Sequence, residues 1–306
     1  MQGIKHFLNF VEIRTKLATT LPFLAALAYV FYTAGAINPR STLIYICSAL
    51  LLDMSVTAIN NHFNARQESG GTPHYSSQVS LGVIAAMLLA SGALGAYLAY
   101  LHGFTILFAG AFCLLVGVAY SFGPAPICKS AYGELVSSFT VATVVMFIVT
   151  SINDPEFAPL GLVFIPSELR LIMDVDLVRL MLFGIVTLPA TFTVAGIMLA
   201  NNICDAEDDR AFRYTLVHSI GLKNSLRLFA CLYYAAYLSI VIASLMRLIP
   251  LWCLLTLGTF VPVQKNIRCF LAKQSKRETF ALSIKNFAVI MFAYAISMAI
   301  GGLLRL

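Results

Sequence analysis

Charged residues are scarce in this chain: Asp, Glu, Lys and Arg make up only 11% of its 306 residues. Apolar residues make up 59%, and the mean hydropathy is +0.86. Soluble domains carry about 25% charged residues, so the composition excludes an ordinary soluble globular protein. The chain also lacks any stretch between apolar runs that is long enough for a separate soluble domain. We therefore expect one membrane-embedded domain over residues 1–306.

The seven cysteines lack a paired spacing, and most lie within apolar runs or at their ends. This scatter favours small core residues over a disulfide framework or a Cys-ligated metal site. The N-terminus lacks a short apolar segment that ends at a small-residue cleavage site. Residues 1–16 instead mix Lys5, His6 and Glu12 with apolar residues, which predicts an amphipathic segment lying on the membrane surface.

Apolar runs of transmembrane length recur along the whole chain, so we predict an all-α bundle of nine membrane-spanning helices around a central cavity. The run at 248–264 is the shortest, and the loop at about 152–178 is expected to fold as a surface helix or a cap. The predicted spans are 17–36, 42–63, 79–101, 103–121, 133–151, 179–203, 225–246, 248–264 and 285–303.

Basic residues fall mostly on one side of this arrangement. With nine spans and an inner N-terminus, 15 of the 20 Lys and Arg residues lie in inner segments. Because inner loops of membrane proteins are enriched in Lys and Arg, the N-terminus is expected in the cytoplasm. The net charge of +6 then reflects topology, and nothing in the sequence indicates nucleic-acid binding. We expect a protein of a prokaryotic cell membrane, surrounded by lipid.

Four acidic side chains stand within five positions, 205–209, directly after a long apolar run. Asp205 and Asp209 are four residues apart, which predicts that they share one face of a helix continuing past the membrane edge. Paired carboxylates without nearby His or Cys suit Mg²⁺, which typically bridges carboxylates to the phosphates of a substrate. The alternative is an ordinary solvated loop between two spans.

A second polar stripe ends the predicted span 42–63. Asn60, Asn64 and Glu68 recur every four residues and share one helical face, which Asp53 and Thr57 extend deeper into the span. Oxygen-bearing side chains on one stripe of a membrane helix point to the bundle interior or to a polar cavity. Hydrogen bonding between helices is the alternative for Asp53, and also for the asparagines. Two such helix ends facing each other would hold Mg²⁺ and a diphosphate between them, with Arg and Lys balancing the charge.

These two motifs resemble those of the UbiA superfamily of membrane prenyltransferases. The first family motif is commonly Asn-Asp-x-x-Asp-x-x-x-Asp, and here Asn60 is followed by Asn61, Asn64 and Glu68 in the places of the aspartates. Metal binding on this side is therefore expected to be weaker. The second family motif, Asp-x-x-x-Asp, is similar to Asp205 with Asp209.

Three further stretches are similar to the 1,4-dihydroxy-2-naphthoate polyprenyltransferases of this superfamily. Residues 199–205 resemble their Asn-Asn-Ile-Arg-Asp segment, with Cys204 in place of the arginine. Thr215-Leu216 with Ile220-Gly221 resembles the following Thr-Leu…Leu-Gly segment. Residues 119–127 with Gly133-Glu134 resemble the Tyr-Thr-x-Gly-Pro-x-Pro-Ile…Gly-Glu segment.

The resemblance implies transfer of a polyprenyl group from its diphosphate to an aromatic acceptor, with Mg²⁺ as cofactor and a demethylmenaquinone-type product. It also implies roles for particular residues. The metal would be held by Asp205 and Asp209, assisted by Asp208, with Asn60, Asn64 and Glu68 opposite; Asp205, Asp209, Asn60 and Asn64 are thus the expected catalytic set. The diphosphate would meet Arg66, Lys129, Arg210 and Arg213. The acceptor and prenyl cavity would include Tyr120, Tyr132, Phe63, Asn201 and Asn202, although an aromatic residue in such a position is more often plain packing.

Three alternatives remain open at this point. An enzyme of the same superfamily for another phenol, such as 4-hydroxybenzoate, would carry the same motifs. A transporter or channel also buries Asp and Asn, but transporters often break paired spans with Gly or Pro near the midplane, and here only Pro189 lies well inside a span of the two key helices. The weakened first motif is also consistent with a non-catalytic relative that binds a lipid or quinone. No obligate protein partner is evident from the sequence.

Overall fold

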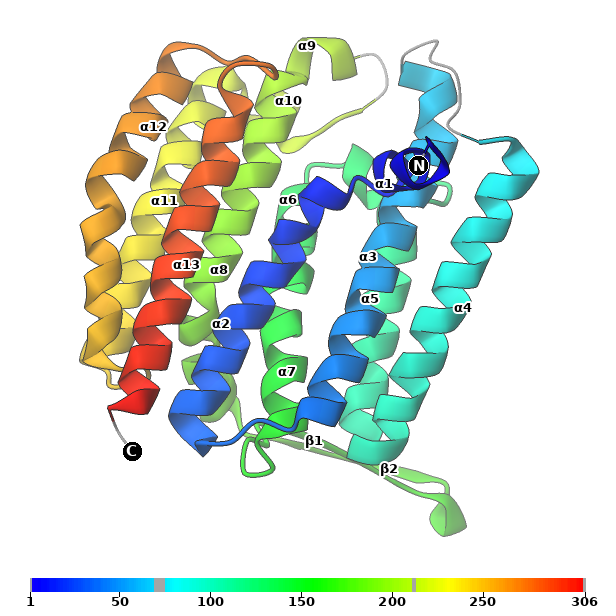
Figure 1. Ribbon diagram of the computed structural model, residues 1–306, viewed down its shortest axis with the longest axis vertical. Helices are drawn as coiled ribbons and strands as arrows, with labels where there is room; N and C mark the ends of the chain where they lie inside the picture. Colours follow the sequence, from blue (N-terminus) through cyan, green and yellow to red (C-terminus); the bar gives the residue numbers. More distant parts are fainter. Residues whose placement is uncertain (1, 69–74, 211–212, 305–306) are drawn as a thin grey trace.

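The structure, a computed structural model, describes residues 2–68, 75–210 and 213–304 as a bundle of long helices (Figure 1). Inside a bilayer every backbone polar group needs a partner within the protein, so the apolar runs form helices. The side chains of Asn64, Arg66, Glu68 and Asp209 lie outside the described residues, and the predictions made for them stay predictions.

The predicted helical membrane architecture is confirmed. Within the described chain, eight helical runs are long and apolar enough to cross a membrane. They are α2 (Leu17–Ala34), α3 (Pro39–Glu68), α4 (Ser77–His102), α5 (Phe104–Ser121), the run Gly133–Asn153, α8 (Leu177–Cys204), α11 (Leu222–Leu245) and α13 (Phe280–Leu303). The run Gly133–Asn153 joins α6 (Gly133–Ser138), the π-helical turn η3 (Phe139–Val144) and α7 (Val145–Asn153).

The shorter elements lie at the two ends of the bundle. At one end lie α1 (Gln2–Phe10), η1 (Ile13–Lys16), η2 (Ile127–Lys129), α9 (Ala206–Asp209) and α10 (Leu216–Ile220). We refer to this end as the motif end. The opposite end carries the strands β1 (Leu160–Ile165) and β2 (Arg170–Val175), joined by η4 (Pro166–Glu168), and we refer to it as the hairpin end (Figure 1).

The ninth predicted span, 248–264, is not confirmed as a membrane-spanning α-helix. It forms the 3₁₀ helix η5 (Leu251–Thr259), which runs into the 13-residue helix α12 (Phe260–Ala272). Pro250 precedes η5 and Pro262 lies in the first turn of α12, where its missing N–H costs no hydrogen bond. The combined segment packs beside α11 and α13 and runs along the bundle (Figure 1).

The loop expected as a surface helix forms an antiparallel β-hairpin instead. Leu160 pairs with Val175 and Ile165 with Arg170, so the two strands are in register along their full length. The first strand, Leu-Gly-Leu-Val-Phe-Ile, holds β-branched and aromatic residues that favour an extended backbone. Thr105 anchors the hairpin to α5, because its Oγ1 donates to Leu160 O at 3.3 Å and accepts from Leu162 N at 3.0 Å.

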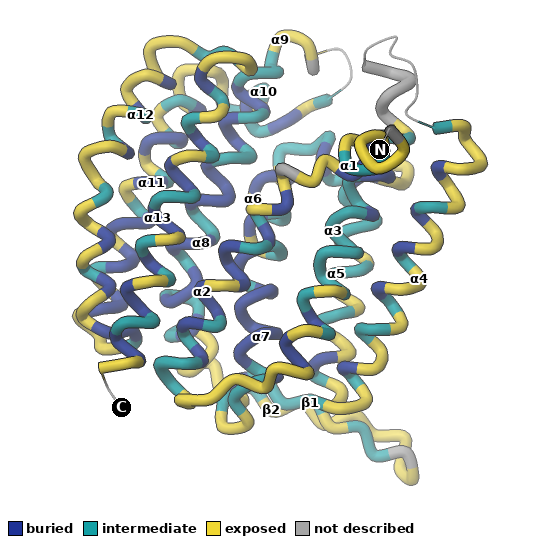
Figure 2. Tube along the Cα trace, viewed as in Figure 1, coloured by how far each residue is buried: buried dark blue, intermediate teal, exposed yellow. Residues whose placement is uncertain are grey.

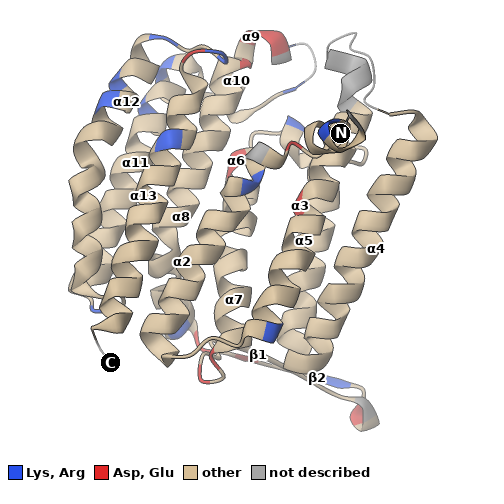
Figure 3. Ribbon diagram, in the orientation of Figure 1, with Lys and Arg blue, Asp and Glu red and all other residues tan. Residues whose placement is uncertain are grey.

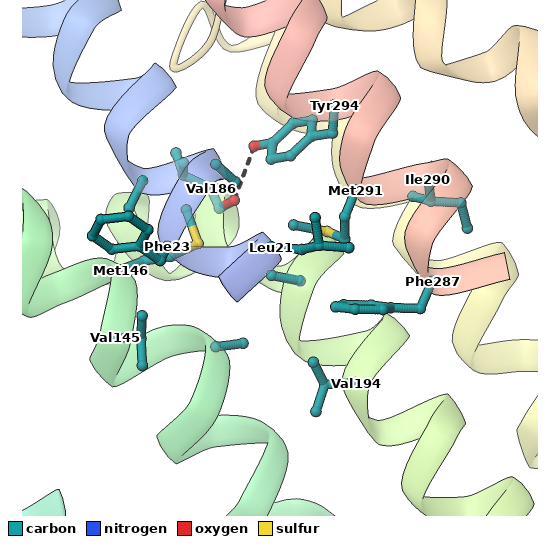
Figure 4. Close-up of a cluster of buried hydrophobic side chains, with 14 of the residues drawn as sticks. Leu21, Phe23, Val145, Met146, Val186, Val194, Phe287, Ile290, Met291 and Tyr294 are labelled. Atoms are coloured by element: carbon teal, nitrogen blue, oxygen red, sulfur yellow. Dashed lines mark hydrogen bonds between the residues drawn. The ribbon is translucent and has the colours of Figure 1, made fainter. Parts of the chain in front are cut away.

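The core lies on one side of the bundle. Half of the apolar window of α8, α11 and α13 is buried within the protein, against 11% for α5. Buried side chains from α2, α7, α8 and α13 meet in the close-up of Figure 4, where Tyr294 Oη donates to the carbonyl oxygen of Val186 at 3.0 Å. Figure 2 shows exposed residues along α4. We infer that α4 and α5 face lipid, while α8, α11 and α13 form the interior.

Candidate functional site

A cavity of about 540 Å³ opens between the helices and extends from the motif end into the bundle. Its deep walls are apolar or small, for example Leu52, Gly95 and Val141. Most of its polar lining lies at the motif end and includes several residues predicted for the site. These residues are Asn60, Tyr120, Asn201, Asn202 and Arg213. The structure therefore brings the predicted end of α3 and the predicted end of α8 to one cavity.

Charged side chains also gather at the motif end. Figure 3 shows the acidic residues of α9 and basic residues of the neighbouring helix ends there, while the walls of the bundle are largely uncharged. This distribution leaves a largely apolar cavity below a charged rim. A bound molecule with an anionic head and an apolar tail would match both parts.

The prediction that Asp205 and Asp209 share one face of a continuing helix was wrong, because the second motif does not lie on one continuous helix. Helix α8 ends at Cys204, and Asp205 has φ −98° and ψ 4°, outside the helical range, before the four-residue helix α9 begins. The chain turns here because the sequence passes from an apolar run to four acids that are better solvated outside the bundle. Asp205 is thereby held at the rim, and its backbone N–H still donates to Asn201 O at 3.1 Å.

Lys276, from the loop between α12 and α13, binds the second motif. Its Nζ lies 2.5 Å from Asp205 Oδ2 and 2.5 Å from Asn201 Oδ1. The Asn201 amide nitrogen in turn donates to Asp205 Oδ2 at 3.4 Å. Two oxygen ligands from one helix end thus converge on a single cationic group.

Asn202 faces a different partner. Its Nδ2 donates to Glu134 Oε1 at 2.8 Å, and both side chains are buried. This bond joins α8 to the N-terminus of α6. The two neighbouring asparagines of the second motif therefore have separate contacts.

The asparagines of the first motif also have different contacts. Asn60 lines the cavity, as predicted. Asn61 instead donates to Phe10 O at 2.9 Å and to Glu12 Oε1 at 3.1 Å, which fastens the N-terminal segment to α3. Phe10 and Val11 are buried against α3 and α4, so residues 2–16 pack on the motif end as well as presenting an exposed face.

Asp53 lies deeper on α3 and contacts Lys16 of η1 and Thr19 of α2. Lys16 Nζ lies 2.7 Å from Asp53 Oδ1 and donates to Thr57 Oγ1 at 2.6 Å, while Thr19 Oγ1 donates to Asp53 Oδ2 at 2.6 Å. The alternative reading of Asp53 as a residue that bonds between helices is confirmed. Since Asp53, Thr19 and Thr57 also line the cavity, this ion pair forms part of its wall.

Basic residues predicted for a diphosphate occupy different places. Arg213 lines the cavity, whereas Arg210 is exposed at the end of α9. Lys129, in η2, accepts a hydrogen bond from Tyr214 N through its carbonyl oxygen at 3.0 Å. The loop that carries Arg213 is fixed by Thr215, whose side chain bonds with His218 in a capping box at the start of α10.

Of the predicted aromatics, Tyr120 lines the cavity. Phe63 is 40% exposed and packs against Phe122 with ring centroids 4.9 Å apart, and Tyr132 is 69% exposed. Among the described residues, the cavity lining includes neither Phe63 nor Tyr132. Their contact with a substrate stays a prediction.

The sequence profile of the UbiA prenyltransferase family matches residues 20–296, which is most of the chain. The chain belongs to the UbiA prenyltransferase family. It is thus an integral membrane protein of a family of prenyltransferases. A search of curated protein sequences finds no match to this UbiA family member.

Solved structures of UbiA homologues have the same fold. A homologue from Archaeoglobus fulgidus bound to GPP and Mg²⁺ is 14% identical, with a TM-score of 0.67 over 97% of this chain and 99% of that chain. A digeranylgeranylglyceryl phosphate synthase is 15% identical, with a TM-score of 0.64 over 99% of both chains. An apo homologue from Aeropyrum pernix K1 is 15% identical, with a TM-score of 0.62 over 94% of this chain and 97% of that chain. At these identities the likeness shows the UbiA fold alone.

The donor atoms of this UbiA protein fit a hard cation. Asp205 Oδ2 and Asn201 Oδ1 already share one ammonium group, and oxygen ligands of this kind suit Mg²⁺. The described residues contain no cluster of three or more His, Cys, Asp or Glu side chains, so the described part of the site supplies few carboxylates. A substrate diphosphate would supply further oxygens.

Sequence reasoning missed the contacts that three residues make in this site: Lys16, Lys276 and Glu134. Lys276 is 71 residues from Asp205 in the chain, in a short loop with two other basic residues, and no local pattern distinguishes it. Lys16 precedes an apolar run, which marks it equally well as a membrane-edge residue. Glu134 did carry a signal, because an acid at the start of an apolar run needs a partner.

Proposed function

We propose that this protein transfers a polyprenyl group from its diphosphate to an aromatic acceptor, 1,4-dihydroxy-2-naphthoate, at the motif end of the cavity. The transfer would release diphosphate and, with this acceptor, carbon dioxide. One observation carries the proposal: a single cavity joins a polar end at both motifs to an apolar depth within the membrane. A prenyl diphosphate has the same division between an anionic head and an apolar tail.

The residues of the site suit the two ends of this substrate. Asp205 and Asn201 would hold Mg²⁺, which when bound stabilises the charge of a leaving diphosphate. Arg213 and Lys276 add positive charge beside the same group. Tyr120 presents an aromatic face at the polar end, where cationic character develops on the prenyl carbon. The apolar walls keep water from that carbon. We place the site at the cytoplasmic face, because the motif end is the basic end.

We choose this acceptor because the second motif and residues 119–127 resemble the corresponding segments of 1,4-dihydroxy-2-naphthoate polyprenyltransferases. A second candidate is a glyceryl phosphate lipid, favoured by the structural likeness to a digeranylgeranylglyceryl phosphate synthase. A third is another phenol such as 4-hydroxybenzoate. Membership of a prenyltransferase family favours all three over a transporter.

The test is product formation by purified protein in detergent with Mg²⁺ and a polyprenyl diphosphate. Dihydroxynaphthoate, 4-hydroxybenzoate and geranylgeranylglyceryl phosphate are supplied in separate reactions, and products are identified by mass spectrometry. A prenylated, decarboxylated naphthalene product supports the proposal. If product forms only with another compound, that compound replaces dihydroxynaphthoate as the proposed acceptor. If the protein binds the diphosphate but forms no product with any acceptor, it is a non-catalytic relative.

A further inference from the structure

The polar end of the cavity has two distinct faces, set by consecutive residues of α8. Residues one apart on a helix point about 100° away from each other. Asn201 therefore turns toward Asp205 and Lys276, and Asn202 turns toward Glu134 on α6. The first face carries a cation and suits an anionic diphosphate. The second face carries the Asn202 amide, which Glu134 holds from behind.

Glu134 is only 4% exposed, and one of its carboxylate oxygens has no hydrogen-bond partner within the described part of the protein. The other, Oε1, accepts from the Asn202 amide at 2.8 Å. Burying a carboxylate oxygen without a hydrogen-bond partner is costly, so most buried polar atoms have one. Glu134 does not line the cavity itself, so it acts on this face through the Asn202 amide that it holds.

Ser121, the last residue of α5, supplies a second unsatisfied group at this end. Its side chain is 3% exposed, its Oγ has no partner among the described residues, and it lines the cavity. Six side chains in the described chain have such an unpaired buried polar atom, and of these Ser121 alone lines the cavity. The adjacent Tyr120 also lines the cavity, and α5 and α6 contact each other.

We propose that Ser121 and Asn202 bind a hydroxyl group of the prenyl-accepting substrate, and that Glu134 is a positioning residue that holds the Asn202 amide. A neutral hydroxyl both donates and accepts a hydrogen bond. Because the amide nitrogen of Asn202 is held by Glu134, its carbonyl oxygen is the group that receives the hydroxyl proton, while Ser121 Oγ–H donates to the hydroxyl oxygen. This inference rests on the proposed function, since it assigns the second substrate to the face opposite the diphosphate.

Measuring ligand binding directly tests this inference independently of prenyl transfer. Calorimetry with purified protein, without Mg²⁺ or prenyl diphosphate, compares 1,4-dihydroxy-2-naphthoate with 2-naphthoate, which has the same ring and carboxylate but lacks the hydroxyls. We expect the wild-type protein to bind the dihydroxy compound more tightly, and Ser121→Ala or Asn202→Leu to reduce that preference about 3- to 10-fold. Ser138→Ala is the matched control, because its buried hydroxyl on α6 already donates to Leu135 O at 3.1 Å. It should leave the preference unchanged.

Two Glu134 variants test positioning. Glu134→Gln keeps an oxygen that accepts from the Asn202 amide, so it should retain the preference for the dihydroxy compound. Glu134→Leu removes that oxygen and should reduce the preference to the level of Asn202→Leu. A role confined to stability would lower the thermal midpoint of these variants without changing the ratio of the two affinities.

Retention of the full hydroxyl preference in both Ser121→Ala and Asn202→Leu would overturn the inference. A third ligand, geranylgeranylglyceryl phosphate, distinguishes the two sources of a hydroxyl. One outcome is that the wild-type protein binds this lipid but not dihydroxynaphthoate, and that Ser121→Ala and Asn202→Leu weaken binding of the lipid. The hydroxyl site then stands, and the proposed aromatic acceptor fails. If the two variants weaken neither ligand, the hydroxyl site is rejected whatever the protein transfers.

Discussion

Asp205 shows how much one residue position decides in this protein. It follows the last turn of α8, and its carboxylate contacts Lys276 and Asn201, which lines the cavity. Glu207 and Asp208 lie on α9 beyond the bend and are exposed. Of the three acids whose side chains are described in this cluster, Asp205 is therefore the one placed to bear on a bound diphosphate.

Replacing Asp205 with Asn should nearly abolish prenyl transfer. The change removes a negative oxygen from the site that would hold Mg²⁺, and loss of one such electrostatic contact costs on the order of 100-fold or more in rate. Steady-state rates at saturating prenyl diphosphate provide the measurement. Glu278→Gln serves as the control, because Glu278 is an exposed acid at the same end that pairs with Lys273 at 2.6 Å. Near wild-type activity in a folded Asp205→Asn protein would remove Asp205 from the metal site.

Lys276 should compete with Mg²⁺ for Asp205. Its ammonium group lies between the same two oxygens, and a cation there opposes a second cation. Lys276→Met should lower the Mg²⁺ concentration for half-maximal activity by about two- to fivefold, the size expected of a partly exposed ion pair. Lys273→Met, in the same loop, should leave it unchanged. A titration with equal Mg²⁺ dependence in wild type and Lys276→Met would show that Lys276 does not share the metal site.

At the scale of elements, local patterns predicted the spans well and their interruptions poorly. The apolar run before Asp205 predicted a helix at 179–203, and α8 covers Leu177–Cys204. The spacing of Asp205 and Asp209 predicted one continuing helix, yet the chain bends there because four neighbouring acids favour solvent over the bundle. The loop at 152–178 has no span to define it, and strand pairing between residues 160–165 and 170–175 depends on contacts that periodicity does not show.

The Lys16–Asp53 pair is one of the contacts between the N-terminal segment and α3. Lys16 is 4% exposed, so removing its partner leaves a buried, unpaired charge. Breaking a buried pair costs about 3–5 kcal/mol. The cost of Lys16→Met should be lower, because the Asp53 carboxylate that it leaves unpaired is partly exposed to the cavity. Asp53→Leu should therefore lower the unfolding midpoint in detergent more than Lys16→Met does.

The double variant Lys16→Met with Asp53→Leu should recover part of that loss, because it leaves no unpaired charge. Arg170→Met is the control, since Arg170 pairs with Glu168 in an exposed bridge at the hairpin end. Additive losses in the double variant would mean that the two residues act independently, and Asp53 would then be open for a role in the cavity.

At the scale of the whole molecule, the bundle has a packed side and a lipid-facing side. Helices α8, α11 and α13 bury half of their apolar windows, whereas α4 and α5 bury 22% and 11% (Figure 2). The cavity is lined by α3, α4 and α5 on one side and by α7, α8 and α13 on the other. We infer that the rigid side fixes Asn201 and Asn202, while the thinner wall gives a long prenyl tail access to the bilayer.

Orientation in the membrane tests the mechanism for the molecule as a whole. Basic residues gather at the motif end (Figure 3). From the positive-inside rule we expect that end in the cytoplasm, where phosphorylated substrates and Mg²⁺ would be available. Single cysteines introduced at Lys273 and Lys223 should react with a membrane-impermeant maleimide only after the cells are opened. A cysteine at Leu169, which is 84% exposed on the hairpin, should react in intact cells. The seven native cysteines are first replaced, since Cys47, Cys231 and Cys269 are exposed. Labelling of Lys273→Cys in intact cells would place Asp205 outside and contradict a cytoplasmic prenyl transfer.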